Sequence, residues 1–414
     1  MARIRIGIIG AGGRGVHSFA RSFSKDHADE TEVVALADPN LVRAQAGIEW
    51  LGIKADIHDN AEDLVKRKDI DAVVVTSPDY LHGEHAALAF KHKKHVFVDK
   101  PLATTVEDCL NAIEASKRAR KVLFMGFNLR HHCVVRRLKE LVSKGTFGDI
   151  FSVQAIEHYN GGRTYHSRWN RLKKYSGGLW IHKGSHDFDV INYLMGNVRP
   201  ARVSCFAGVF TFKPERLPFK PRRGVEPGPT CNKCVYNREC PDAFMFREDG
   251  SSAVYKMFGD EAAAVDGYHK NLCMYLSDKD THDQGIAIVE YENGATASHS
   301  EYFATPISNR YYWIEGTRGH GEGHLHDRWV KVYPRWSHDV IHHEIHPEAG
   351  GHGGADPGLF QTFVDSIKRR KRPTASGVDG TWSVAVAVAA EKSRAEKRVV
   401  EISELLDPRS KVLQ

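Results

Sequence analysis

RIRIGIIGAGGRG, residues 3–15, is the stretch that decides the fold of the amino-terminal half. An apolar strand at residues 3–9 runs directly into the pattern G-x-G-x-x-G, and a helix is expected to follow. In this context Gly10 permits a tight turn, Gly12 lets the backbone approach a pyrophosphate, and Gly15 allows close packing of helix on strand. Free N–H groups at the start of the helix attract phosphates, so the stretch predicts a dinucleotide site.

A second strand and its acidic end complete this fingerprint. Residues 32–37 predict strand two, and Asp38 follows at once. An acidic residue about 20 residues beyond the glycine turn accepts hydrogen bonds from an adenosine ribose and repels a 2′-phosphate. We therefore expect NAD rather than NADP, with Gly13 and Arg14 of the turn also in contact with the cofactor.

The composition is that of an ordinary globular chain. Of 414 residues, 41% are hydrophobic and 27% charged, and the net charge is +6, which predicts two domains or one domain with a large extension. No apolar run approaches ~18 residues, so we expect no membrane partner. The early first strand leaves no room for a signal peptide, and the seven cysteines then favour thiols or metal over disulfides; we expect a cytoplasmic protein.

One dense basic run, at residues 368–372, stands at the end of a predicted helix. Cations suit the negative end of a helix dipole, so a solvated helix end is favoured over a nucleic-acid surface. We expect no nucleic-acid partner.

Strands and helices alternate over residues 1–148, as a doubly wound parallel sheet requires. The apolar runs at 71–76, 95–98 and 122–127 are expected to be its central strands. Ligands bind outside the carboxyl ends of such strands. The residues that follow these ends, and so are expected beside the cofactor, are Ser77, Pro78, Asp99, Lys100 and Asn128.

Residues 149–414 have a different texture, which predicts a second, α+β domain on a large, open, mostly antiparallel sheet. An insertion is expected at about 214–282, and two closing helices are expected at 357–370 and 380–397, the latter packing back on the first domain. The predicted strands lie at 149–159, 201–212, 284–291, 295–303 and 310–315, with one helix at 178–194.

Five motifs occur together along the chain. They are GIIGAGGRG at 7–15, SPDYLHGEHA at 77–86, DKPLA at 99–103, GGLWIHKGSHDFD at 177–189 and GGHGGAD at 350–356. In this combination, over nearly the whole chain, the sequence resembles the Gfo/Idh/MocA family. The resemblance implies a Rossmann domain followed by a substrate domain, and NAD(P)-dependent oxidation or reduction of a sugar, cyclitol or glycoside hydroxyl. It also implies a homodimer or homotetramer formed through the open sheet.

The resemblance also implies catalytic roles. The family's glutamate-lysine-proline motif stands here as Asp99-Lys100-Pro101, with the acid one methylene shorter. By resemblance, Lys100 reaches both the nicotinamide ribose and the reacting hydroxyl. His186 aligns with the family's catalytic histidine, whose ordinary pKa near ~6.5 suits proton transfer. His82, in the second motif, is expected among the cofactor contacts.

His182 departs from the family pattern, because many of its dehydrogenases carry aspartate four residues before the catalytic histidine. Residues i and i+4 share one helix face, so His182 and His186 project together. The pair could serve as a proton relay or substrate contact, as half of a metal site, or in packing. Lys183 adds a cation, which suits a polyhydroxylated or anionic substrate.

The segment YHSRWNR at residues 165–171 is a candidate substrate loop. Tyr165 and Trp169 could stack on a sugar face while Arg168 bonds hydroxyls or a carboxylate; a rigid interdomain turn explains the segment equally well. His352 sits between glycines in an expected loop, and the resemblance places it near the cleft. The stretch HHEIH at 342–346 favours a solvated loop.

Three cysteines, Cys231, Cys234 and Cys240, stand within ten residues of the insertion. A tetrahedral structural Zn²⁺ needs a fourth ligand, and likeness to related family members makes Cys273 the best choice. Free thiols and an iron–sulfur cluster are the alternatives.

Two enzymatic functions remain open at this stage. The first is an NAD-dependent sugar or cyclitol dehydrogenase that releases NADH. The second is a glycoside-cleaving enzyme, in which tightly held NAD oxidises a ring hydroxyl, elimination expels the aglycone, and NADH returns the hydride. An NAD-sensing binding protein is disfavoured because Lys100 and His186 are retained.

Overall fold

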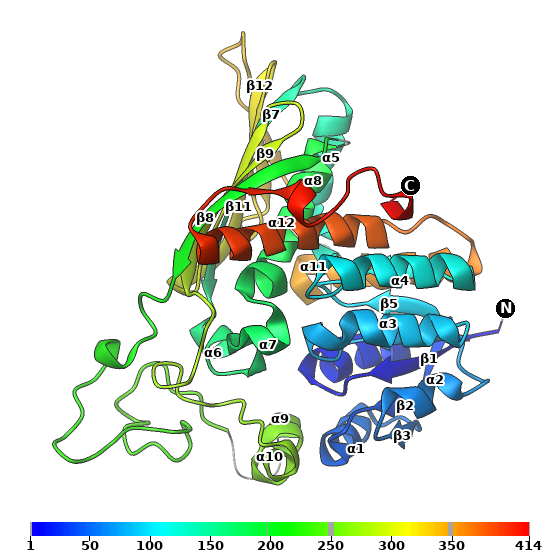
Figure 1. The fold of residues 1–414 in the computed structure, drawn as a ribbon, viewed down its shortest axis with the longest axis vertical. Helices are drawn as coiled ribbons and strands as arrows, with labels where there is room; N and C mark the ends of the chain where they lie inside the picture. The colour runs from blue at the N-terminus through cyan, green and yellow to red at the C-terminus, as the bar shows by residue number, and fades with distance from the viewer. Residues whose placement is uncertain (1, 197, 247–251, 347–350, 414) are drawn as a thin grey trace.

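The computed structural model describes residues 2–196, 198–246, 252–346 and 351–413, without the side chains of 351–353. Two sheets organise this chain, one in each half of the sequence (Figure 1). Among the described residues, no helix is long and apolar enough to cross a membrane.

The first sheet has six parallel strands in the order β3-β2-β1-β4-β5-β6, the doubly wound arrangement that the sequence predicts. All four residues of β4 are buried, as expected of a parallel strand covered on both faces. Its strands are β1 Ile4–Ile9, β2 Thr31–Ala37, β3 Asp56–His58, β4 Ala72–Val75, β5 His95–Val98 and β6 Leu123–Met125. The helices between them are a π-helix at Arg14–Ala20, α1 Leu41–Leu51, α2 Ala61–Lys66, α3 His82–Lys91 and α4 Val106–Ala119.

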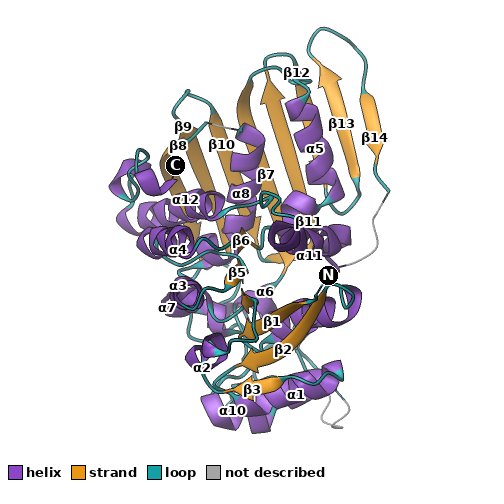
Figure 2. Cartoon of the chain, turned by 90° about the vertical axis from the view of Figure 1, so that its right-hand side faces the viewer, coloured by secondary structure: helices purple, strands orange, loops and turns teal. Residues whose placement is uncertain are grey.

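The second sheet has nine strands in the order β14-β13-β12-β11-β7-β10-β9-β8-β15. Only β7 and β10 pair in parallel among its described neighbours, so the prediction of a mostly antiparallel sheet is confirmed. Figure 2 shows α5 and α8 across one face. The strands are β7 Ile150–Asn160, β8 Pro200–Gly208, β9 Gln284–Tyr291, β10 Thr296–Tyr302, β11 Ala304–Gly316, β12 Gly319–His324, β13 Trp329–Pro334, β14 Ile341–Glu344 and β15 Val400–Glu401. The helices are α5 Cys133–Ser143, α6 Gly162–Tyr165, α7 Lys173–Ser176, a π-helix at Trp180–Gly184, α8 Ser185–Met195, α9 Ala253–Phe258, α10 Asp260–Asp266, α11 Gly351–Lys368 and α12 Gly377–Glu396.

The last two long helices connect the two sheets. In α11, Phe363 packs edge-on against Phe97 and Phe124 of the first sheet, with ring centroids 5.2 and 5.5 Å away. Helix α12 contacts α4 and β6 on one side and β8 and α8 on the other. The basic run begins where α11 ends, and its Lys371 lies 2.8 Å from Asp365, in keeping with the predicted helix end.

A buried ion cluster fixes these helices to one another. Arg130, directly after the first sheet, donates to Asp189 of α8 at 2.8 and 2.6 Å. The same guanidinium reaches Asp379 of α12 at 3.0 Å. Because the three side chains come from three different elements, the cluster sets the position of α8 relative to the first sheet. That position matters because α8 carries His186.

Two expectations from the sequence are wrong. Residues 319–344 form the strands β12, β13 and β14, and HHEIH begins inside β14 rather than in a loop. The strand was missed because β14 lies at the sheet edge and stays largely exposed, so its sequence lacks the apolar alternation that marks a strand. Helix α11 begins at Gly351, so His352 lies in its first turn and not in a loop; its side chain lies outside the described part of the chain.

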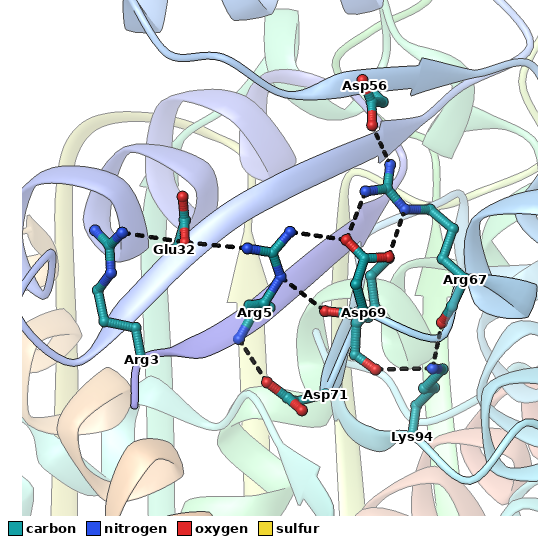
Figure 3. Close-up of polar contacts among 9 residues, drawn as sticks. Arg3, Arg5, Glu32, Asp56, Arg67, Asp69, Asp71 and Lys94 are labelled. Atoms are coloured by element: carbon teal, nitrogen blue, oxygen red, sulfur yellow. Dashed lines mark hydrogen bonds and ion pairs between the residues drawn. The ribbon is translucent and has the colours of Figure 1, made fainter. Parts of the chain in front are cut away.

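Charged residues join the strands of the first sheet at their amino ends, away from the glycine turn (Figure 3). Asp69 pairs with Arg5 and with Arg67 at 2.8 Å each, and Arg67 also reaches Asp56 at 2.5 Å. Hydrogen bonds from Arg67 and Arg5 hold the pKa of Asp69 below its usual range. Exposed pairs of this kind contribute about 1 kcal/mol or less each. Several weak surface ion pairs therefore link the strands at this end of the sheet.

Candidate active site

The glycine turn has the geometry that its sequence predicts. Gly10 has φ +99°, and a Cβ there would stand 2.6 Å from the backbone N of Ser77. A Cβ on Gly15 would stand 2.0 Å from the carbonyl of Gly10, so no side chain fits there. Around Gly12, by contrast, no described heavy atom lies within 4 Å of the Cβ position. The turn is therefore closed beneath the strand and open where a phosphate has to approach.

Asp38 holds this turn from the end of β2. Its Oδ2 accepts the backbone N–H of Ala11 at 2.8 Å, and its Oδ1 accepts that of Asn40 at 2.9 Å. Arg43 Nη1 lies 3.4 Å from the same carboxylate. Burial raises the pKa of Asp38, and the charge of Arg43 opposes that rise. The acid is fixed beside the turn, where the sequence places an adenosine ribose.

Arg14, Asp99 and Asn128 meet at the carboxyl edge of the first sheet. Arg14 Nε donates to Asp99 Oδ2 at 3.1 Å, and its Nη1 lies 3.8 Å from Asp356 Oδ2. Asn128 Nδ2 donates to Asp356 Oδ1 at 3.3 Å. Asp356 belongs to α11, close after His352, so the start of that helix borders the cleft. The sequence offered GGHGGAD as a motif but no role for this aspartate.

Lys100 and His182 are in direct contact across the two halves of the chain. Lys100 Nζ donates to the backbone carbonyl of His182 at 2.5 Å. The imidazole Nδ1 of His182 lies 2.6 Å from Asp79 Oδ2, and its Nε2 lies 3.1 Å from Asn170 Nδ2. This set of partners assigns the proton to Nδ1 and leaves Nε2 as an acceptor. Both ring nitrogens are thus engaged by the protein, which argues against a metal at His182.

Burial shifts the pKa values of all three groups. Desolvation raises the pKa of Asp79 to about 7, against the charges of His82 and Lys100. Desolvation, with Lys100 and Lys183, holds the pKa of His182 well below 6.5. The pKa of Lys100 is lowered by burial, and the carboxylates of Asp79 and Asp99 oppose that. The site therefore holds a neutral imidazole beside an amine with a lowered pKa and an acid with a raised pKa.

Lys183 lies in a buried ion cluster. Its Nζ is 2.8 Å from Glu157 Oε1 and stands over the rings of Tyr159 and Tyr165, at 4.5 and 5.6 Å. Burial disfavours the charge, but Glu157 keeps the pKa of Lys183 above its usual value. Arg310 Nη2 reaches the same Glu157 oxygen at 2.6 Å. The predicted substrate cation thus has a carboxylate partner already.

The predicted substrate loop covers His182. The rings of Tyr165 and Trp169 stand 5.7 and 5.3 Å from the imidazole, both edge-on. Asn170 supplies the hydrogen bond to Nε2. Arg168 acts near Lys270 instead. Burial is the main cause of the lowered pKa of Lys270, and the charge of Arg168 lowers that pKa further. The loop therefore reaches the cleft through its aromatic residues.

Three further predicted residues lie at the cleft or just beneath it. His186, one helical turn beyond His182, faces Phe127 with ring centroids 6.3 Å apart. Ser77 Oγ is 2.9 Å from His85 Nδ1. His82 is buried, with its ring nitrogens 2.7 and 2.8 Å from the carbonyls of Pro101 and Ser77, so it braces the backbone next to Lys100 and Pro78. The geometry gives His82 a positioning role.

The zinc prediction is not supported. All seven cysteines are described and free, and no group of three or more His, Cys, Asp or Glu among the described residues is arranged to hold a metal. Cys234 Sγ instead accepts the backbone N–H of Gly228 at 3.3 Å, and burial raises the pKa of Cys231. The backbones of Cys231 and Cys273 are tied to the opposite chain segment, Cys231 N to Asn271 O at 2.9 Å and Cys273 N to Pro229 O at 2.8 Å. This pairing closes the insertion through backbone hydrogen bonds.

Sequence reasoning missed the partners of the predicted residues. Asp79 and Asn170 lie inside stretches that the sequence singled out. The available signal was a polar residue soon after a strand end for Asp79, and a polar residue next to an aromatic one for Asn170. Glu157 and Arg310 lie within long strands, where nothing in the pattern marks them as a pair.

Two family profiles match the chain. Residues 4–127 match "Oxidoreductase family, NAD-binding Rossmann fold", and residues 139–402 match "Oxidoreductase family, C-terminal alpha/beta domain".

Curated relatives span most of the chain. YteT of Bacillus subtilis (strain 168), named provisionally as an oxidoreductase, is 27% identical over 84% of this chain and 85% of its own length. Myo-inositol 2-dehydrogenase of Thermotoga maritima is 25% identical over 97% of this chain and 100% of its own. The 2,7-anhydro-N-acetylneuraminate hydratase of Escherichia coli (strain K12) is 30% identical over 50% of this chain and 53% of its own. Among solved structures, levoglucosan dehydrogenase in complex with NADH has a TM-score of 0.73 at 17% identity, covering 97% of this chain and 99% of its own, which shows the shared fold.

The variant Asp79→Asn tests the burial of the acid beside His182. A carboxyl with a raised folded-state pKa adds stability that is complete below the unfolded-chain pKa of about 4 and is lost as the pH rises through about 7. D79N lacks this proton, so its thermal midpoint minus that of wild type should increase between about pH 5 and about pH 8. Titratable groups that do not interact with Asp79 are unchanged by the substitution and cancel in the difference. Asp26→Asn, at an exposed pair with Arg21, is the control for the charge change; a D79N difference that stays constant with pH would contradict the buried setting.

Proposed function

The chain belongs to the Gfo/Idh/MocA family of NAD-binding oxidoreductases, and from this we propose that it transfers a hydride between NAD and a hydroxyl-bearing carbon of a sugar, cyclitol or glycoside. The observation that carries the proposal is the fixed position of Lys100. Its ammonium stands at the carboxyl end of β5, bonded to the His182 carbonyl and near Asp79, beside the open glycine turn.

The residues of the first domain fit a bound dinucleotide. The space around Gly12 and the absence of a side chain there suit a pyrophosphate, and the fixed carboxylate of Asp38 suits a ribose diol. Acceptance or donation of hydride at the nicotinamide is the chemistry that NAD supplies when bound. The protein has to hold the substrate carbon against that ring and move one proton.

Lys100 is the group that we assign to the reacting hydroxyl. Burial lowers the pKa of this amine, which makes it a better proton donor to a hydroxyl that it contacts. Its bond to the backbone carbonyl of His182 orients the ammonium. Asp79 and Asn170 hold the imidazole of the same residue. His182 is thus a positioning residue. His186 is the group that we assign to accept the hydroxyl proton, since its helix brings it to the same edge.

A cavity at the second sheet, whose lining includes Glu157, the partner of Lys183, has the size and the polarity for one sugar ring. Its volume is about 290 Å³, near the lower bound for small-molecule pockets, and Glu157, Tyr159, Asn309 and Arg310 are among its lining. Carboxylate and amide oxygens accept hydrogen bonds from hydroxyls, and amide and guanidinium N–H groups donate to them. An aromatic face suits a sugar ring. Myo-inositol and levoglucosan, which appear in the names of the related dehydrogenases, are small polyols of this kind.

Glycoside cleavage with recycled NAD is the second candidate function. One observation favours it: Asp79, whose pKa is raised to about 7, lies near Lys100 and adds a further group that can gain or lose a proton close to neutral pH. Elimination of an aglycone needs such additional groups, because a second proton has to be removed and one returned. The matching relative that is named a hydratase supports chemistry beyond simple dehydrogenation in this family.

Turnover with NAD separates the two candidates. The enzyme is incubated with NAD and a panel of cyclitols, aldoses, levoglucosan and aryl glycosides, and both absorbance from NADH and release of the aglycone are measured. A dehydrogenase produces one NADH per substrate oxidised, whereas the cleaving enzyme releases aglycone without net NADH. Lys100→Met and His186→Ala should each lower kcat/KM by about 10²–10⁴-fold, the usual contribution of a group that transfers a proton.

Lys54→Ala, at an exposed position of the first domain, is the matched control and should keep wild-type activity. Undiminished kcat/KM in both K100M and H186A would overturn the catalytic assignment for either reaction.

We also infer that the chain forms a homodimer or homotetramer through the open face of the second sheet. Phe206 of β8 is 82% exposed, directly opposite Ile286 of β9, and Ile288 on the same face is 52% exposed. Adjacent exposed apolar side chains mark an interaction surface. Sedimentation velocity should give an oligomer for wild type and a smaller species for the double variant Phe206→Asp, Ile288→Asp. Val235→Asp, at another exposed apolar residue, should leave the oligomer intact; a monomeric wild type would contradict the inference.

A further inference from the structure

The insertion packs on the cofactor-binding half of the first domain. Helix α10 lies beside α1 in both views (Figures 1 and 2), and α9 contacts α1 as well. Met257 and Phe258 of α9 are buried in the same apolar core as Val16 and Ala44, which follow the glycine turn and β2. The insertion is therefore anchored in the core of the Rossmann domain.

Two buried residues after β2 bind the insertion through polar contacts. Asn40 Nδ2 donates to the carbonyl of Ala262 at 2.7 Å, and Arg43 Nη2 reaches Asp266 Oδ2 at 2.6 Å. Arg43 also lies 3.4 Å from Asp38 through its Nη1. Buried polar groups require partners, so these contacts fix the insertion relative to the acid that we assign to the ribose.

Lys270 extends from this insertion to the glycine turn. Its Nζ lies 3.9 Å from the centroid of the Phe258 ring and 3.9 Å from the Cβ position of Gly13. No carboxylate of the described residues forms an ion pair with it, while burial and the charges of Arg168 and Arg43 lower its pKa to about 7. His17 of the following π-helix is the other titratable group at this point, and its own pKa is lowered by burial and by Lys270.

This arrangement leaves positive charge without a counter-ion beside an open turn. The protein keeps Lys270 near two arginines although burial and repulsion both disfavour its charge. An anion at the turn would remove that penalty, because a desolvated cation gains most from a nearby charge. The space around Gly12, one residue away, is where the turn admits a phosphate.

We propose that the insertion is a clamp on the bound dinucleotide, in which Lys270 binds the pyrophosphate. The inference rests on the NAD site of the proposed function. The phosphates would lie between the backbone amides of the glycine turn and the ammonium of Lys270, so release of the cofactor requires loss of a charged contact. Slow release keeps one NAD on the enzyme through successive turnovers, which the glycoside-cleaving reaction requires.

Binding of cofactor fragments to full-length Lys270→Met tests the clamp without reference to turnover. Methionine keeps most of the length of the side chain and its apolar part against Phe258 but removes the charge. Isothermal titration with NADH, ADP-ribose and adenosine should show about 10- to 100-fold weaker binding of the two pyrophosphate ligands, the size expected for a lost charge-assisted hydrogen bond. Adenosine should bind within about twofold of wild type. Lys256→Met, at an exposed lysine of α9, is the control and should bind all three as wild type does.

Lys270→Arg keeps the cation and should restore most of the affinity if K270M is weakened by loss of charge. Equal NADH and ADP-ribose affinities in K270M and wild type would overturn the clamp. Equal losses for adenosine and NADH, or no recovery in K270R, would do so too, because they indicate a change of shape. A wild type that binds no NADH would refute the proposed function itself, whereas normal NADH binding in both proteins refutes only the clamp.

Discussion

The hydrogen bond between His182 and Asp79 is the contact on which the cleft depends. It joins the π-helix that leads into α8 in the second domain to the segment after β4 in the first, at 2.6 Å, and the side chains of His182 and Asp79 are only 13% and 3% exposed. A buried polar group needs its partner, so neither domain can move at the cleft without leaving one of these groups unsatisfied. Lys100 bonds to the carbonyl of the same histidine. The positions of the amine, the imidazole and the acid are therefore set together.

The two sheets supply complementary parts to this contact. The parallel sheet ends its strands at one edge, where the open turn at Gly12, Asp38 and Lys100 lie. The antiparallel sheet presents Glu157 and Arg310, and the Glu157 carboxylate pairs with both Arg310 and Lys183. Helix α12 and the Arg130 cluster fix the position of the two sheets relative to each other. The insertion adds Lys270 on the cofactor side, close to the glycine turn.

Local motifs made part of this site predictable. The tight turn at Gly10 and the close packing at Gly15 are predictable from the glycine pattern, and the structure has a positive φ at Gly10 and no room for a side chain at Gly15. The pairing of His182 with Asp79 could not be predicted, because it joins residues about a hundred positions apart through packing of the whole fold. The strand β14 was missed because an exposed edge strand has no apolar period. The cysteine spacing predicts a zinc site that the structure does not support, because no group of three or more possible ligands among the described residues is arranged to hold a metal.

A crystal structure of the enzyme with NADH tests most directly the claim that this cleft is where cofactor and polyol meet. We expect the adenosine ribose on the carboxylate of Asp38 and the nicotinamide ring between Lys100 and His186. We also expect Lys100 Nζ within hydrogen-bond distance, about 3 Å, of the nicotinamide ribose. A nicotinamide ring directed away from Lys100, with His186 outside the reach of any ligand on that face, would contradict the claim.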